Sequence, residues 1–142
     1  MRDIAFASAA ALACTGALAE VTVTDAWVRG TVPAQKTTGA FLTLTSSEDA
    51  RVVGVSTPVA EMAEIHVTEN QGGVMRMHGV EGLALPAGKP VKLEPGGHHV
   101  MLMGLKAAVT EGAKVPLTFT IEDRHGKRSR VEVSASVRPL GR

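Results

Sequence analysis

The sequence predicts a single all-β domain, an antiparallel β-sandwich or barrel of about eight or nine strands. Short segments rich in β-branched residues recur along it and alternate between apolar and polar positions. Turns containing Gly or Pro separate these segments, and we find no stretch of a dozen residues with helical periodicity. The length of 142 residues suits one domain, and a hydrophobic content of 44% is typical of a globular core.

Five strands are expected in the first part of the chain, at residues 21–28, 40–45, 51–55, 63–68 and 73–80. The first begins Val21-Thr-Val-Thr24, an alternation of β-branched residues that favours an extended conformation. The fourth and fifth are separated by Gln71-Gly72-Gly73, which is typical of a turn.

Four more strands are expected at residues 91–93, 98–103, 115–122 and 128–137. Turn residues stand before and between them, at Pro86–Gly88, Glu94–Gly97 and Glu111–Gly112. His125-Gly126 lies between the last two segments, which therefore predict a terminal hairpin. Pro116 near the start of its segment indicates an edge strand or a strand entrance, because proline donates no hydrogen bond.

The first nineteen residues predict an export signal. Arg2 precedes an apolar stretch from Ile4 to about Ala13, and Ala17-Leu18-Ala19 is a small-x-small cleavage pattern. We expect cleavage after Ala19, which makes residues 1–19 a signal peptide and residues 20–142 one periplasmic domain without a membrane span. A lipid-anchored Cys14 is the alternative, and Ala11-Leu12-Ala13 fits the residues expected before such a cysteine poorly.

Composition excludes several classes of function. The formal net charge is +1, so nothing favours binding to nucleic acid or to an anionic membrane surface. The sequence contains no Gly-x-Ser-x-Gly motif, and its one cysteine, Cys14, lies in the predicted signal peptide. We therefore expect a protein that is not an enzyme.

Methionine and histidine gather in one part of the predicted domain. Five methionines and four histidines fall between residues 62 and 103: Met62, Met75, Met77, Met101, Met103, His66, His78, His98 and His99. Alternation along the seventh expected strand places His99, Met101 and Met103 on the face opposite Val100, and His66 faces away from its apolar neighbours. Histidines and methionines on outward faces of neighbouring strands predict a metal site.

The donor atoms select the metal. Thioether sulfur is a soft ligand and imidazole a borderline one, and this mixture favours Cu(I) over zinc, calcium or magnesium. Methionine forms no disulfide, so such a site survives in an oxidising compartment. Without a cysteine after residue 14, the domain cannot form a blue-copper centre, which requires a thiolate.

The spacing of His66, Met77, His99 and Met101 matches the H-x10-M-x21-H-x-M pattern of the periplasmic copper chaperones called PCu(A)C. The surrounding segments are similar to that family too: Asp25-Ala-Trp-Val-Arg29, Thr38-Gly-Ala-Phe-Leu42, Glu64-Ile-His66, Gly73-Val-Met-Arg-Met77 and Pro95-Gly-Gly-His-His-Val-Met-Leu-Met-Gly-Leu105. The resemblance extends over nearly the whole predicted domain.

The resemblance implies a monomeric, cupredoxin-like (Ig-like) β-sandwich with Greek-key connections. It implies one Cu(I) held near the surface by His66, Met77, His99 and Met101. It also implies delivery of that copper to the CuA centre of cytochrome c oxidase subunit II, beside a Sco-type thiol protein.

Two alternatives stay open from the residues themselves. Glu64, His66 and His99 have the donor types of a hydrolytic zinc site, although no His-Glu-x-x-His motif is present. The second alternative is that the domain is a metal-free Ig-like interaction module. The remaining soft residues are expected to pack or to lie outside the site: Met62 in the core, Met75 and Met103 flanking the ligands, and His78, His98 and His125 away from them.

Overall fold

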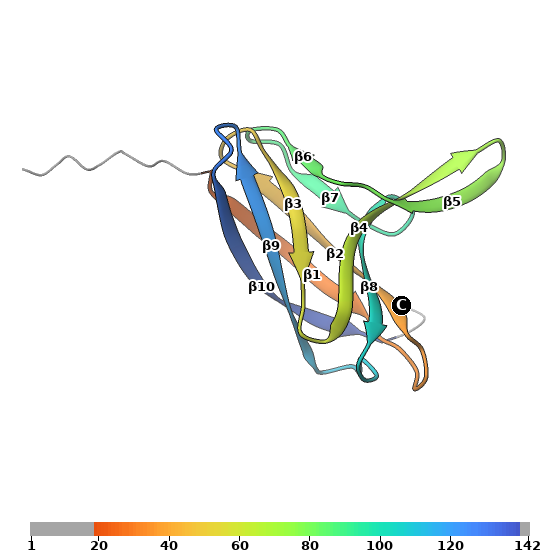
Figure 1. The fold of residues 1–142 in the computed structure, drawn as a ribbon. Helices are drawn as coiled ribbons and strands as arrows, with labels where there is room; N and C mark the ends of the chain where they lie inside the picture. The colour runs from red at the N-terminus through yellow and green to blue at the C-terminus, as the bar shows by residue number, and fades with distance from the viewer. Residues whose placement is uncertain (1–18, 140–142) are drawn as a thin grey trace, which may run out of the picture.

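The computed structural model describes residues 19–139, which form ten β-strands and no helix within that range (Figure 1). The strands are β1 (Val21–Arg29), β2 (Thr37–Ser46), β3 (Ala50–Ser56), β4 (Ala60–Gln71), β5 (Val74–Gly79), β6 (Leu83–Leu85), β7 (Val91–Leu93), β8 (His98–Leu105), β9 (Lys114–Asp123) and β10 (Arg128–Arg138). The predicted signal peptide lies almost entirely outside the described residues. Within them, no helix has the length and apolar character needed to cross a membrane.

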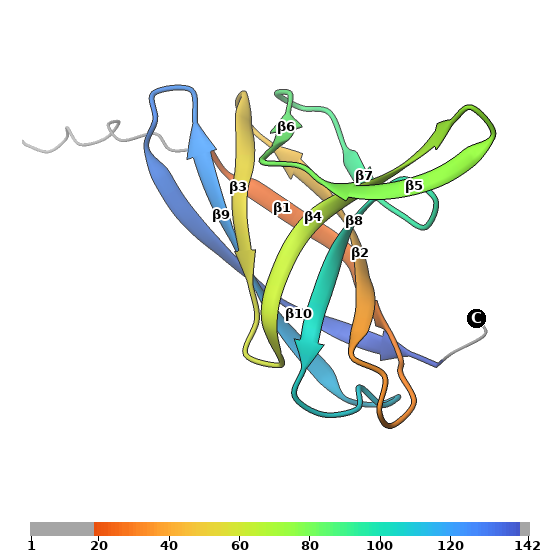
Figure 2. The ribbon, with the colours of Figure 1, turned by 45° about the vertical axis from the view of Figure 1, so that its right-hand side comes forward.

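The hydrogen-bonded strand order is β5-β4-β8-β2-β1-β10-β9-β3-β6, and β7 pairs separately with β2. The sheet bends around a central core, so β3 and β4 come to lie side by side (Figures 1 and 2). All strand pairs among the described residues are antiparallel except β1 with β10, where Trp27 lies opposite Ser136. The predicted all-β sandwich is confirmed, with one parallel pair.

The tenth strand, β6, was not predicted from the sequence. It has only three residues, between Gly82 and Pro86, and it pairs with β3 at Val52 opposite Leu83. The predicted terminal hairpin is confirmed as β9 and β10. Pro116 lies near the start of β9, before the ladder with β3 begins at Thr118, so it marks a strand entrance rather than an edge strand.

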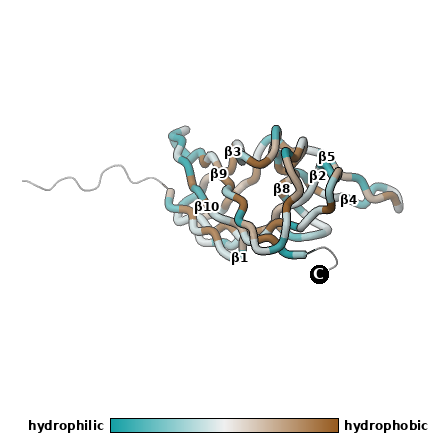
Figure 3. Tube along the Cα trace, turned by 90° about the horizontal axis from the view of Figure 1, so that it is seen from below, coloured by the Kyte–Doolittle hydropathy of each residue, from teal (hydrophilic) through white to brown (hydrophobic). Residues whose placement is uncertain are grey.

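The core consists of apolar side chains at alternate positions of the strands. On β9, Val115, Leu117, Phe119 and Ile121 are all buried. Seen along the sandwich, the strands surround this interior, and the hairpin of β4 and β5 projects away from it (Figure 3). A sequence with one cysteine has no disulfide within the chain, so noncovalent interactions, with core packing foremost, stabilise the domain.

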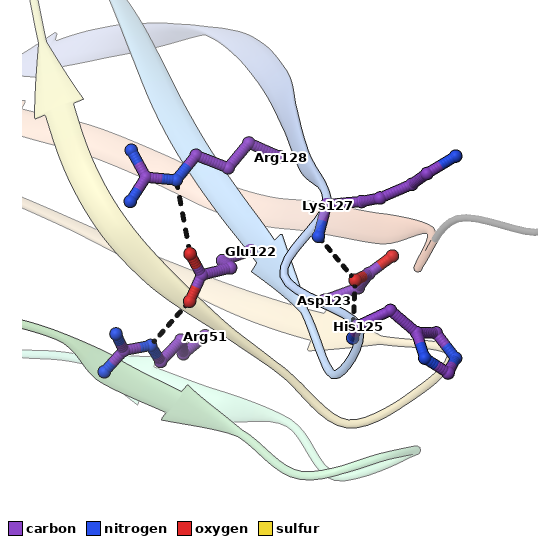
Figure 4. Close-up of polar contacts among 6 residues, drawn as sticks. All are labelled: Arg51, Glu122, Asp123, His125, Lys127 and Arg128. Atoms are coloured by element: carbon purple, nitrogen blue, oxygen red, sulfur yellow. Dashed lines mark hydrogen bonds and ion pairs between the residues drawn. The ribbon is translucent and has the colours of Figure 1, made fainter.

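Polar contacts organise the turn between β9 and β10 (Figure 4). Asp123 Oδ1 accepts hydrogen bonds from the backbone N–H groups of His125 (2.8 Å) and Lys127 (2.9 Å). Burial raises the pKa of the Asp123 carboxyl, but these hydrogen bonds and the neighbouring charges outweigh it and hold the pKa below its ordinary value of 3.8. Beside the turn, Glu122 pairs with Arg51 at 3.3 Å and Arg128 at 3.2 Å.

A lowered pKa means that the charged Asp123 stabilises the folded state above pH 3.8, and that this contribution is lost as the pH falls through the lower folded pKa. In Asp123→Asn the acceptor oxygen remains but does not titrate. We expect the variant to lose less stability than the wild type between about pH 5 and pH 2. Thermal unfolding followed by circular dichroism across this range measures the difference, and parallel curves for the two proteins would contradict it.

Candidate metal centre

The four residues of the H-x10-M-x21-H-x-M pattern lie on one face of the sheet formed by β5, β4 and β8. The antiparallel ladder of β4 and β8 places His66 directly opposite His99. Met101 follows two residues after His99, and on β5 Met77 lies opposite Thr68, which is two residues after His66. Since residues that are opposite or two apart share a face, the structure brings all four to one side of the sheet.

The inner face of the same strands explains why these side chains point outward. Val100 and Leu102 on β8 are fully buried, and Ile65 on β4 is nearly so. A turn with Gly96 at a φ of +88° precedes β8, and it is closed by a hydrogen bond from the Glu94 N–H to the His98 carbonyl (2.9 Å). The turn and the buried aliphatic residues together fix which side chains of β8 share a face, and the predicted alternation is found, although His99 itself is buried on the outer face.

The two histidine rings lie with their centroids 6.0 Å apart. His66 Nε2 is 3.1 Å from Glu64 Oε1, while His66 Nδ1 is buried and has no hydrogen-bond partner among the described residues. The Nδ1 atom of His99 lies 3.3 Å from the carbonyl oxygen of Gly97. Since a carbonyl oxygen only accepts, the proton of the neutral ring belongs on Nδ1 in this hydrogen bond, and Nε2 is left to coordinate a metal. One ring nitrogen held by an oxygen acceptor and the other unpaired is the arrangement typical of metal-binding histidines.

His99 is only 5% exposed, and burial lowers its pKa. The hydrogen bond to Gly97 acts in the opposite direction, and the charges of His66, Arg29 and His98 lower the pKa further. Neutral imidazole is the form that coordinates a metal, so this environment keeps His99 in the competent state.

A cavity of about 290 Å³ opens beside His99, and Met77, Met101, Thr68 and Phe41 contribute to its lining. His66 is not among its lining residues, although its ring neighbours that of His99. The cavity combines two thioethers with an imidazole. It therefore suits a soft cation, and the orphaned nitrogen of His66 provides a further donor nearby.

Phe41 forms one wall of this cavity, and Trp27 packs behind it. The Phe41 ring lies 6.2 Å from the His99 ring and 4.6 Å from the Trp27 ring. It covers Gly39, where an added Cβ would approach the Phe41 ring to 3.0 Å. Arg29 lies 5.2 Å over Phe41, a cation–π contact. Sequence reasoning did not assign this wall, although Trp27, Arg29 and Phe41 all stand in the segments that carry the family resemblance.

The other methionines and histidines divide between the two faces. Met75 lies at the hairpin tip opposite Asn70, on the face of the four residues, and is 59% exposed. The expectation that Met62 packs in the core is wrong, because its side chain is 53% exposed. Met62 precedes His66 by four residues on the same strand, so strand alternation places it on the outer face with His66.

His78 and His98 lie on the opposite face from the site, on either side of Val67. His78 Nε2 contacts Glu69 Oε1 at 2.9 Å, and His125 lies in the turn after β9. Among residues 19–139, no group of three or more His, Cys, Asp or Glu side chains is arranged to hold a metal. For the zinc alternative, the described residues therefore show no three-residue His/Glu donor set, and Glu64 Oε1 is a hydrogen-bond partner of His66 Nε2.

Comparison with known proteins places the chain in a family. A family model described as "LpqE-like: Putative lipoprotein LpqE-like" matches residues 21–137. A curated relative from Leifsonia xyli subsp. xyli, "Putative lipoprotein Lxx21020", is 35% identical over 104 residues. That match covers 72% of this chain and 63% of the relative, so the chain spans less than two thirds of the relative's length.

Solved structures agree with this assignment. The apo PCuAC domain from PmoF1 has a TM-score of 0.67 at 20% identity, over 84% of this chain and 93% of that domain, and it establishes the shared fold. Apo-DR1885 from Deinococcus radiodurans is 31% identical over 96% of this chain and 93% of its own, with a TM-score of 0.61. The CuI-DR1885 structure is 33% identical with a TM-score of 0.59, over 80% of this chain and 74% of its own. The resemblance to PCu(A)C and the cupredoxin-like β-sandwich are confirmed, and the chain belongs to the LpqE-like family.

Proposed function

We propose that this chain is an exported copper chaperone that binds one Cu(I) through His66, Met77, His99 and Met101. The observation that carries the proposal is the pairing of His66 with His99 across β4 and β8, where the buried Nδ1 of His66 has no hydrogen-bond partner within residues 19–139. DR1885, which is 33% identical, has a structure described as its CuI form, and this supports copper as the cargo. The physiological acceptor we propose is the CuA centre of cytochrome c oxidase subunit II, with a Sco-type thiol protein as a second partner.

An anaerobic competition titration tests the proposal directly. Cu(I) is titrated into the protein against a chromophoric chelator, and one equivalent is expected to leave the chelator. X-ray absorption of that complex should show both nitrogen and sulfur ligands. A protein that leaves the chelator fully loaded, or that binds copper through oxygen and nitrogen alone, contradicts the proposal.

The exposure of the ligands indicates the order of exchange. Met77 is 56% exposed on the projecting hairpin, whereas His99 is buried. An acceptor ligand therefore approaches from the Met77 side, and a thioether, the weaker donor, leaves first. The copper stays Cu(I) throughout, because only ligands are exchanged.

Met77→Ala and Met101→Ala should each bind Cu(I) less tightly and release it faster than the wild type. One donor fewer lowers the barrier for an incoming ligand, which enters before the histidines leave. Stopped-flow transfer to a colorimetric Cu(I) chelator measures the rate, and Met75→Ala at the hairpin tip is the control. Transfer rates that stay unchanged in both variants would contradict this order of exchange.

Export is part of the proposal. Both the matching family and the Leifsonia relative are described as lipoproteins, which are exported proteins. We propose cleavage after Ala19, in line with the Ala17-Leu18-Ala19 pattern. The mass of the protein from its native host separates a chain that starts at Glu20 from one that starts at a lipid-modified Cys14.

A further inference from the structure

Two methionines outside the proposed site form a cross-strand pair. Met62 on β4 lies directly opposite Met103 on β8. The ladder between these strands is continuous from this pair to the pairs Glu64–Met101 and His66–His99. Met62 and Met103 therefore lie on the same outer face as the proposed ligands, two positions along each strand from Glu64 and Met101.

The accessibility of this pair is not that of core methionines. Met62 is 53% exposed and Met103 is partly buried, while their neighbours Ala63 and Leu102 face inward. Directly opposite residues have Cβ atoms about 4.5–5.5 Å apart, and methionine has three rotatable bonds. Both sulfur atoms can therefore converge on one ion without a change in the backbone.

The surroundings favour a cation over a neutral ligand. Glu64 lies opposite Met101 and next to the pair. A carboxylate on the same face as two neutral thioethers attracts a soft monovalent cation to the sulfur atoms.

We propose that Met62 and Met103 form a second site for a soft monovalent cation, Cu(I) or Ag(I), weaker than the His66–His99 site. The position of Met101 gives this second site a role in loading the first one. Met101 lies two residues from Met103 and two residues from His99 on β8, so it is near the ligands of both sites. An ion held by Met62 and Met103 reaches the histidines by exchanging one thioether at a time through Met101. Each exchange forms one metal–sulfur bond as another breaks, with no electron transferred. This role in loading rests on the proposed function, whereas the existence of the second site does not.

The test uses the full apo chain with methionine methyl groups labelled with ¹³C. Ag(I), which does not change oxidation state, is added under NMR observation, and Cu(I) is added anaerobically in parallel. The first equivalent should shift the methyl signals of Met77 and Met101, and the second should shift those of Met62 and Met103. In Met62→Leu/Met103→Leu the second equivalent should be lost and the first retained, because leucine preserves the apolar volume without the sulfur.

Met75→Leu is the matched control, since Met75 has a similar exposure on the same face and lies at the far end of the hairpin. It should retain both equivalents. Methyl signals of Met62 and Met103 that stay unshifted at two equivalents, or a second equivalent that persists in the double variant, overturn the second site. A first equivalent that leaves Met77 and Met101 unshifted contradicts the proposed function instead, and the signals of Met62 and Met103 are read independently of it.

Discussion

Replacing His99 by alanine is expected to lower the affinity for Cu(I) by more than about 100-fold. Loss of an outer group that merely orients a metal ligand costs about 10–100-fold in affinity, so loss of the ligand itself costs more. His99 is the best prepared donor of the set, because it is buried against Phe41 and held by the Gly97 carbonyl. The anaerobic competition titration measures the affinity of wild type and variant side by side.

The neighbouring residue supplies the matched control. His98 lies one position earlier on β8 and on the opposite face, so His98→Ala should bind Cu(I) as the wild type does. A His99→Gln variant keeps most of the buried volume and separates loss of the donor from loss of packing. Equal effects of the His98 and His99 substitutions would show that the register of β8 is wrong, and with it the proposed site.

Replacing Phe119 by alanine should lower the free energy of unfolding by about 3–5 kcal/mol, the usual cost of removing a buried aromatic ring. Phe119 is the largest fully buried side chain and belongs to β9, away from the candidate metal centre. Natural domains have only about 5–15 kcal/mol of stability in total, so this variant loses a large part of it. Urea unfolding followed by circular dichroism measures the change.

Thr118→Ala is the control for this substitution, because Thr118 is the preceding residue and points away from the core. It should change the stability by less than about 0.5 kcal/mol. A reducing agent should leave both results unchanged, since the chain has no disulfide to lose. A Phe119→Ala protein as stable as the wild type would contradict the assignment of this residue to the core.

Local alternation was sufficient to predict which faces of the strands carry the soft donors. The inward positions of Val100 and Leu102 and the outward positions of His99 and Met101 follow from apolar neighbours two residues apart. The same rule, applied backwards from His66, places Met62 outside, although a methionine in a strand is more often core. For Met62, the residue type led to the wrong prediction, whereas strand alternation leads to the correct face.

Contacts between distant segments were beyond what the pattern predicts. The family resemblance implies that His66 and His99 lie close together, but no local pattern indicates that they lie directly opposite each other, because the register of β4 and β8 depends on the packing of the whole sheet. The parallel pairing of β1 with β10 and the three-residue β6 have no local signal either. The contact between the rings of Trp27 and Phe41 is equally non-local, since these rings meet only through the pairing of β1 with β2.

The projecting hairpin described above has a thermodynamic consequence. Every residue of β5 is exposed, and among the described strands it pairs only with β4, so little packing stabilises the position of β5. Of the four proposed ligands, only Met77 belongs to β5, and a metal bound by Met77 and the other three ligands ties this strand to β4 and β8. The conformational entropy that β5 loses when the metal orders it weakens metal binding. By thermodynamic linkage, a partner protein that binds β5 changes the affinity for the metal without contacting the metal.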